Sequence, residues 1–457
     1  MPIAITDPRT GEVVRTYPEF TAAQIEEKLA AAAMAFPSYR LTSFDQRADW
    51  LRNAADLLDQ RNDEIARLMS LEMGKTVAAA RAEATKSAQG MRFYAENAAA
   101  FLADEPIDPA SVGASKAYGR YLPLGVVLAI MPWNFPLWQA VRFAAPALMA
   151  GNVGLLKHAS NVPGSALFLE QLFADAGFPQ ATFQTLLIGS GAVAGIIADG
   201  RVAAATLTGS EGAGVSVGRA AGESLKKVVL ELGGSDAFIV MPSADISKSA
   251  RIAVTARVQN NGQSCIAAKR FIIHEDIYDE WLAQFRAGFA ALTLGDPAAD
   301  GTDVGPLSTE AGRDEVAAQV RNAIAHGAVV EFGGNVPDRR GWWFEPTILT
   351  NITREMDMYH EEVFGPVAQV FRVADIDQAI EIANDTRFGL GSNAWTTDAQ
   401  EQDRFIRDLV AGQTFINGMV TSFPGLPFGG VKNSGHGREL ARAGIREFCN
   451  LKAVWIG

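Results

Sequence analysis

The chain has 457 residues, 48% of them hydrophobic and 20% charged, which is enough for two or three domains with buried cores. Its 52 acidic and 40 basic side chains give a formal net charge of −12, which argues against nucleic acid as a main partner. The two cysteines, Cys265 and Cys449, form neither a disulfide framework nor a zinc site, so we expect free thiols and no bound metal.

No membrane segment is expected. The first residues lack the basic start and apolar run of a signal peptide. The most apolar stretch, 122–138, contains Pro123, Pro132 and Pro136 and cannot cross a bilayer as one helix. These features predict a soluble, acidic, cytoplasmic protein.

The first hundred residues predict a hairpin at 3–18 and then three helices. Thr21 and Ser43 each precede a glutamine by three residues, the pattern of a capping box that opens a helix. We expect the first helix to end at Pro37 and the second to end at Gly74. The third helix should reach about residue 103, and we assign no chemistry to this region.

From residue 124 onward, short apolar runs alternate with helical segments. The strands are expected at 126–131, 153–156, 185–188, 203–207 and 228–232, and the helices at 140–150, 163–176, 191–199 and 213–225. This rhythm is typical of a doubly wound parallel sheet, which binds ligands beyond the carboxyl ends of its strands.

A second alternating region follows Gly234. The strands are expected at 237–240, 271–273, 329–332, 367–373, 393–395 and 414–416, and the helices at 244–258, 276–292, 309–326, 375–384 and 398–411. Two α/β lobes in one chain indicate a cleft between them. The tail, 448–456, alternates weakly and is expected to add one more strand.

Cys265 is the first candidate for chemistry, because it ends the polar, turn-rich segment Asn-Gly-Gln-Ser-Cys at 261–265. Such surroundings favour an accessible thiol, although most lone cysteines are inert buried side chains. Cys449 keeps that inert interpretation. None of the five histidines stands in a setting typical of a cysteine hydrolase.

Two polar residues stand at expected strand ends. Glu231 lies in an apolar run, where loss of hydration would raise its pKa and suit a general base; an ordinary strand end is the alternative. Asn134, in the stiff segment Pro-Trp-Asn-Phe-Pro at 132–136, is either an oxyanion donor or a turn cap.

Other features point to a dinucleotide. The glycine-containing segment 209–214 follows a strand and opens a helix, where backbone N–H groups attract phosphate, but it lacks the G-x-G-x-x-G pattern. Lys157 and Ser160 end the second strand, and 155–169 contains no acidic residue to bind a ribose 2′-hydroxyl. This pattern favours NADP and leaves NAD possible.

Together these residues resemble the aldehyde dehydrogenase superfamily over almost the whole chain. Seven segments match in the expected order: 132–136, 157–160, 208–210, 230–234, 261–265, 361–366 and 427–430. The resemblance implies Cys265 as nucleophile, Glu231 as general base, and an oxyanion site made by the Asn134 side chain and the Cys265 backbone N–H. It implies these cofactor residues: Trp133, Lys157, Ser160, Gly209, Ser210, Leu232, Glu362 and Phe364.

The resemblance also implies the architecture. It predicts an aldehyde dehydrogenase-like α/β fold with two Rossmann-like lobes and a small oligomerisation arm. The cofactor-binding domain would comprise 1–104 and 124–232, and the catalytic domain 233–430. The arm would comprise 105–123 and 431–457. Members of this superfamily are commonly homodimers or homotetramers.

Within the superfamily, 132–138, 233–236 and 263–270 look most like bacterial succinate-semialdehyde dehydrogenases, which implies NADP-dependent oxidation of that aldehyde to succinate. Arg142 stands where several relatives carry a substrate arginine, with a surface salt bridge as the alternative interpretation. Several relatives place a second arginine where this chain has Gln259, so Ser422 is a further candidate for binding the substrate.

Two other functions remain open from the sequence. The first keeps the chemistry but changes the substrate to another short or medium aldehyde. The second is a non-catalytic binding or structural protein on this fold. The presence of Cys265, Glu231 and Asn134 together argues against the second, because a scaffold does not need all three.

Overall fold

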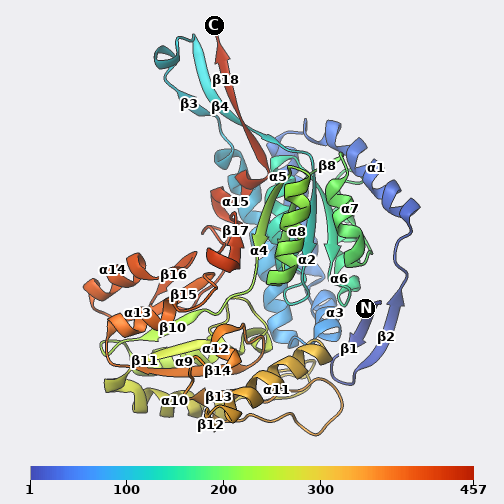
Figure 1. Ribbon diagram of the computed structural model, residues 1–457. Helices are drawn as coiled ribbons and strands as arrows, with labels where there is room; N and C mark the ends of the chain where they lie inside the picture. The colour runs from blue at the N-terminus through green and yellow to red at the C-terminus, as the bar shows by residue number, and fades with distance from the viewer. Residues whose placement is uncertain (1) are drawn as a thin grey trace.

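Two predominantly parallel sheets, each flanked by helices, make two lobes of the chain (Figure 1). The computed structural model describes residues 2–457. A two-stranded hairpin and a three-stranded antiparallel sheet complete the fold. The prediction of an α/β fold with two lobes is confirmed.

The N-terminal region forms the expected hairpin, followed by four helices where three were expected. Its elements are β1 (Ile3–Asp7), β2 (Glu12–Tyr17), α1 (Ala22–Tyr39), α2 (Phe44–Gln60), α3 (Asn62–Met73) and α4 (Val77–Phe101). Thr21 and Ser43 make the predicted capping boxes, and Gly74 ends α3 with a φ of 76°.

Two predictions in this region are wrong. Pro37 lies inside the last turn of α1, where the helix survives because the Arg40 backbone N–H still bonds to the Phe36 carbonyl. The stretch expected as one helix is divided at Arg61 into α2 and α3. Apolar spacing continues across this break, so periodicity alone does not reveal it.

The first sheet has the strand order β17-β9-β8-β5-β6-β7, with only β17 antiparallel to its neighbour. Its strands are β5 (Val126–Met131), β6 (Val153–His158), β7 (Phe183–Thr185), β8 (Val202–Thr208), β9 (Lys227–Glu231) and β17 (Gly435–His436). The connecting helices are α5 (Trp138–Ala150), α6 (Pro163–Asp175), α7 (Val193–Ala198) and α8 (Glu211–Glu223). The strand expected at 185–188 lies earlier in the chain, at β7. Residues 186–188 are buried, which explains their apolar sequence, but they do not continue the strand.

The second sheet has the order β12-β13-β14-β11-β10-β15-β16. Its strands are β10 (Ala237–Val240), β11 (Arg270–His274), β12 (Val329–Phe332), β13 (Thr347–Thr350), β14 (Val367–Val373), β15 (Gly391–Trp395) and β16 (Gln413–Ile416). Its helices are α9 (Ile246–Val258), α10 (Tyr278–Ala290), α11 (Glu310–Ala325), α12 (Asp357–His360), α13 (Ile376–Asn384) and α14 (Ala399–Asp408). The sequence analysis missed the short strand β13.

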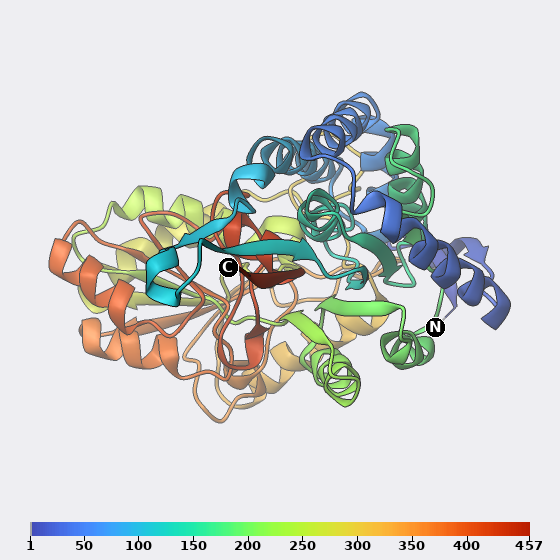
Figure 2. The same ribbon diagram turned by 90° about the horizontal axis from the view of Figure 1, so that it is seen from above.

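A third, antiparallel sheet projects from the body of the molecule (Figure 1). It contains β3 (Glu105–Ile107), β4 (Lys116–Pro123) and β18 (Cys449–Ile456), in the order β18-β4-β3. Figure 2, seen from above, looks along the direction in which this sheet projects, so the sheet lies in front of the body of the molecule. Part of 431–457 lies elsewhere, because β17 joins the first sheet and α15 (Ala441–Glu447) packs against α4 and α5.

Helix α5 is the central element of the first lobe, since all 13 of its residues are buried. A helix that is apolar around most of its circumference must be covered on every side, here by α2, α4 and the sheet. Its first turn therefore has a fixed position next to the ends of β5 and β8. No helix among residues 2–457 is long and apolar enough to cross a membrane.

Candidate active site

A cavity of about 420 Å³ lies between the two lobes. The first lobe contributes segments that follow β5, β8 and β9, and the second lobe contributes Cys265 and parts of 315–388. Eight residues predicted from the sequence line it: Trp133, Asn134, Gly209, Ser210, Leu232, Cys265, Glu362 and Phe364. Five predicted residues do not line it: Glu231, Lys157, Ser160, Arg142 and Ser422.

The loop before Cys265 is held in an unusual backbone conformation by its own side chains. Asn260 and Asn261 have φ values of 53° and 58°, a left-handed region that asparagine tolerates better than most residues. The Asn261 amide donates to the backbone carbonyls of Gly74 and Pro306, at 2.9 and 3.0 Å. The loop is therefore anchored to the helical region and to the second lobe at once.

Lys269 holds the same loop from the other side. Its buried ammonium donates to the carbonyl oxygens of Ser264 and Cys265, at 2.7 and 2.6 Å, and lies 3.3 Å from the Glu362 carboxylate. Gly234 completes the packing, because a Cβ there would lie 2.7 Å from the Cys265 carbonyl oxygen. Gly234 after β9 thus allows the loop that ends at Cys265 to approach the end of β9 closely.

The Cys265 thiol is in a desolvated setting. Burial raises its pKa to about 12, and the Lys269 ammonium opposes that rise by stabilising the thiolate. The protonated thiol therefore dominates at neutral pH. Formation of the nucleophilic thiolate requires a group that accepts its proton or a change in its surroundings when ligands bind.

Asn134 is fixed beside this loop. The Asn134 Nδ2 donates to the Gln263 backbone carbonyl at 3.0 Å, and the Asn134 backbone carbonyl accepts from Asn260 Nδ2 at 2.7 Å. One Nδ2 hydrogen is left over, and the Cys265 backbone N–H makes no hydrogen bond within residues 2–457. Two donors beside the sulfur are thus available to an oxyanion.

Glu231 ends β9 but lies outside the cavity. Its carboxylate faces Gly429, where a Cβ would lie 2.7 Å from Oε1, and neither oxygen has a hydrogen-bond partner in the described chain. Burial raises the pKa of Glu231 well above its usual value, and the nearby Glu439 raises it further. Such a carboxyl group is suited to accept a proton at neutral or alkaline pH.

Arg142 differs from both interpretations of the sequence. It does not line the cavity, and it is buried instead of forming a surface salt bridge. Its guanidinium pairs with Glu439, lies 4.4 Å from the centre of the Phe428 ring and donates to Thr208 Oγ1 at 3.4 Å. A carboxylate of the protein therefore already neutralises this arginine.

The start of α8 fits a phosphate-containing cofactor. Ser210 caps this 13-residue helix, and a Cβ at Gly212 would meet no atom within 4 Å. Backbone N–H groups at the helix start therefore face open space in the cavity, where an anion would be stabilised. Glu362 and Phe364 line the same cavity on the second lobe.

Lys157 and Ser160 lie beyond that cavity, at and just after the end of β6. Burial lowers the pKa of Lys157, and the Glu19 carboxylate opposes this shift. His158 between them is structural, because its ring nitrogens contact the carbonyls of Met131 and Pro136 and burial lowers its pKa to about 4.

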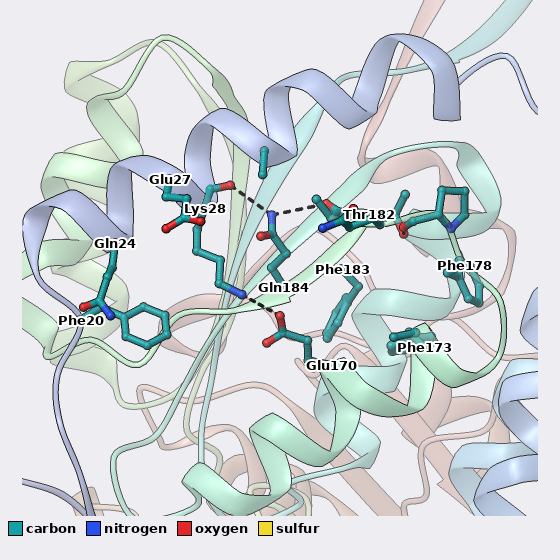
Figure 3. A pocket seen from close by; sticks show the side chains of 15 residues that line it. Phe20, Gln24, Glu27, Lys28, Glu170, Phe173, Phe178, Thr182, Phe183 and Gln184 are labelled. Atoms are coloured by element: carbon teal, nitrogen blue, oxygen red, sulfur yellow. Dashed lines mark hydrogen bonds and ion pairs between the residues drawn. The ribbon is translucent and has the colours of Figure 1, made fainter.

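A second hollow of about 340 Å³ lies between α1, α6 and β7 (Figure 3). None of the predicted site residues lines it. Its central cation, Lys28, pairs with Glu170 at 2.7 Å, and Gln184 donates to the Lys28 carbonyl at 3.0 Å. Its polar groups are thus largely satisfied by one another.

The sequence analysis missed the residues that hold the segment around Cys265 in place. Lys269, Asn260, Asn261 and Gln263 all lie within five residues of Cys265. The consecutive asparagines before a glycine indicated a turn, but not which distant carbonyls their amides would contact. The buried position of Lys269 depends on the second sheet and is not visible in local sequence.

The raised pKa of Cys265 predicts how the free protein reacts with iodoacetamide. With a pKa of about 12, the thiolate fraction should rise about tenfold per pH unit between pH 7 and 9. The rate of alkylation at Cys265, followed by mass spectrometry in a Cys449→Ser background, should rise accordingly. A rate that levels off below pH 9 would contradict the assigned environment.

Comparisons with known proteins agree with this geometry. The aldehyde dehydrogenase family profile matches residues 1–454. A succinate-semialdehyde dehydrogenase [NADP(+)] 1 of Mycobacterium tuberculosis is 65% identical over 456 residues, covering 100% of both chains, and its Mycobacterium ulcerans counterpart is 63% identical at the same coverage.

The solved structure of a succinic semialdehyde dehydrogenase from Streptococcus pyogenes, in complex with NADP+, superposes with a TM-score of 0.96. It is 35% identical and covers 99% of both chains. An NADP-dependent enzyme of E. coli gives a TM-score of 0.97 at 34% identity, covering 100% of this chain and 95% of the other. The chain belongs to the aldehyde dehydrogenase family.

Proposed function

We propose that this protein oxidises succinate semialdehyde to succinate and reduces NADP+. The observation that carries the proposal is the cavity between the lobes, where Cys265, the Asn134 amide and the start of α8 face one another. The names of the relatives at 62 to 65% identity support the choice of substrate and cofactor.

The first chemical step forms a bond between Cys265 Sγ and the aldehyde carbon. The carbonyl oxygen becomes an oxyanion, and the free Asn134 Nδ2 hydrogen and the Cys265 backbone N–H donate to it. The S–H bond breaks in this step, and its proton passes to water. When bound, the cofactor supplies a hydride acceptor, and departure of the hydride converts the adduct into a thioester.

Hydrolysis of the thioester is assigned to Glu231. Its carboxylate would take a proton from water as the water oxygen attacks the acyl carbon. The C–S bond then breaks, which releases succinate and leaves the Cys265 thiolate. The side chain must first leave its position against Gly429, because it does not line the cavity. Its raised pKa means that the basic form gains population as the pH rises.

The cofactor is assigned to the cavity and to the region beyond it at the end of β6. We place the phosphates at Gly209 and Ser210, and the nicotinamide end beside Trp133, Leu232, Glu362 and Phe364. Lys157 supplies a cation with no carboxylate within 4 Å in residues 2–457, and Ser160 supplies a hydroxyl. Both suit a 2′-phosphate, whereas NAD remains the alternative cofactor.

We also infer a division of labour along the chain. Residues 1–104 and 124–232 would bind the cofactor, 233–430 would carry the nucleophile, and 105–123 with the C-terminal strand would mediate homodimer or homotetramer formation. Leu451 and Trp455 on the edge strand β18 are 50% and 58% exposed, which supports this role. The two free thiols suit the reducing cytoplasm.

The assay that tests the proposal measures NADPH absorbance with purified protein and succinate semialdehyde. We expect kcat/KM to be at least about tenfold higher with NADP+ than with NAD+, because Lys157 and Ser160 can bind the 2′-phosphate. Higher kcat/KM with other short or medium aldehydes would replace the substrate. Absence of turnover with every aldehyde and both cofactors would overturn the proposal.

Glu231→Gln tests the assigned base. The variant should release NADPH in a single burst of about one equivalent per site, because thioester formation does not need Glu231. Steady-state turnover should then fall by about 10² to 10⁴-fold. Stopped-flow absorbance separates the two phases, and unchanged steady-state turnover would exclude Glu231 as the base.

Leu451→Asp tests the arm. A charge on the exposed apolar face of β18 should shift the protein to a smaller species in light scattering coupled to size-exclusion chromatography. Asn450→Asp adds the same charge on the opposite face of the strand and is the matched control. Equal masses for the wild type and Leu451→Asp would contradict the assigned interface.

A further inference from the structure

The helix that follows Asn134 has no cap of its own. Leu137, at the N-cap position of α5, makes no side-chain hydrogen bond to the helix. The first backbone N–H groups of any helix lack partners within it, and leaving them unpaired in a buried position is costly. All 13 residues of α5 are buried, so these N–H groups need an acceptor from elsewhere in the fold.

A glutamate on α4 supplies this acceptor. Glu83 Oε1 accepts from the backbone N–H groups of Leu137 and Trp138, at 2.9 and 3.0 Å. The Glu83 side chain is buried, and its negative charge lies at the positive end of the helix dipole, where it is stabilising. The cap of α5 thus comes from a residue 54 positions before Leu137 in the chain.

Lys75 neutralises the buried carboxylate. Its ammonium forms an ion pair with Glu83 Oε2 and lies 4.0 Å from the centre of the Phe135 ring. Burial lowers the pKa of Lys75, and the Glu83 carboxylate opposes this shift. A single buried charge without its partner is strongly unfavourable, so the two side chains act as a unit. This unit contacts the turn at Phe135 and at the start of α5.

The segment between Asn134 and the capped start of α5 is short and stiff. Only Phe135 and Pro136 separate Asn134 from Leu137. The ring of Pro136 fixes its own φ, and steric contact with that ring restricts the backbone of Phe135. A displacement of the helix start is therefore passed on to Asn134, because the intervening residues cannot absorb it.

The residue before Lys75 holds the other half of the oxyanion site. The Gly74 carbonyl accepts from Asn261 Nδ2 at 2.9 Å, and Asn261 belongs to the loop before Cys265. Residues 74–76, which connect α3 to α4, thus lie beside both the turn of Asn134 and the loop of the nucleophile. The sequence analysis assigned no chemistry to this helical region.

We propose that Glu83, neutralised by Lys75, is a positioning residue that fixes the Asn134 amide for the oxyanion. This inference rests on the proposed function, in which Asn134 donates to the oxyanion, and it names the residues that set the geometry of that donor. Neither Lys75 nor Glu83 lines the cavity, so they act on the reaction through Asn134. Displacing a catalytic group by ~1 Å costs about 10²-fold in rate.

A double-mutant cycle with Asn134 tests the inference. Lys75→Met/Glu83→Leu replaces the ion pair by apolar side chains of similar size and leaves the start of α5 without its acceptor. We expect the single-turnover rate constant for NADPH formation, measured by stopped-flow absorbance at saturating NADP+, to fall by about 10²-fold. In an Asn134→Ala background the same substitutions should cost less than about threefold, because the amide that they position is absent.

Two further variants separate the acceptor from the charge. Lys75→Met/Glu83→Gln removes both charges but keeps an amide oxygen for the two N–H groups, so its rate constant should stay within about fivefold of the wild type. Glu83→Asp keeps the charge but withdraws the carboxylate by one methylene, and should cost about tenfold only when Asn134 is present. This second cycle does not depend on the folding of the apolar variant.

Glu72 provides a matched control from the same helical region. It lies on α3, and its buried carboxylate accepts from the backbone N–H groups of Gly164 and Ser165, at 2.6 and 3.2 Å, at the start of α6. Helix α6 likewise has no cap of its own. Glu72→Leu should lower the melting temperature as the loss of the Glu83 cap does, but should leave the rate constant at saturating NADP+ within about threefold.

The inference is overturned by equal losses with and without Asn134, because the pair would then act on the structure in general. It is also overturned by an unchanged rate in Lys75→Met/Glu83→Leu, by an equal loss in Lys75→Met/Glu83→Gln, or by a comparable loss in Glu72→Leu. If Asn134→Ala reacts as fast as the wild type, the oxyanion role in the proposed function fails, and the inference fails with it. If Asn134→Ala is slow and the losses add, only the inference fails.

Discussion

The site depends on one buried ammonium, Lys269, which joins three separate parts of the catalytic centre. It fixes the successive carbonyls of Ser264 and Cys265 and pairs with Glu362, which lines the cavity on the same lobe. A fully buried lysine is tolerated only when such partners replace its lost hydration. Because these partners come from different segments, Lys269 holds the segment at Cys265 and the Glu362 carboxylate in one fixed arrangement.

The same desolvation governs the chemistry. Burial raises the pKa of both the candidate nucleophile Cys265 and the candidate base Glu231, so both groups retain protons more strongly than in water. Fixed donors around the sulfur, the Asn134 amide and the Cys265 backbone N–H, suit a developing oxyanion. The cost is that proton transfer must be coupled to the arrival of ligands or to movement of Glu231.

Much of this site was predictable because its determinants are local. The turn at Asn134, the strand end at Glu231 and the turn-rich segment before Cys265 carry their signals within a few residues. The parallel sheets follow from the alternation of apolar runs and helices. The strand ends of the first sheet meet at the cavity because parallel strands present their carboxyl ends at one edge of a sheet.

The features that the sequence did not reveal depend on contacts between distant segments. The partner of Arg142 is Glu439, almost 300 residues away, and only the fold decides that this arginine is neutralised. The short strand β13 has weak periodicity and is defined by pairing with β12 and β14. Pro37 was misread because a helix end is set by its cap as well as by the residue that disfavours continuation.

Charge neutralisation also explains why the substrate contacts are the least predictable part of the site. The sequence named Arg142 as the cationic candidate for binding the substrate, and nothing in the local sequence distinguishes it from Lys75 or Lys86. In the fold, Glu83 pairs with Lys75 and Glu439 pairs with Arg142. Carboxylates elsewhere in the chain therefore decide which of these cations keeps an unpaired charge.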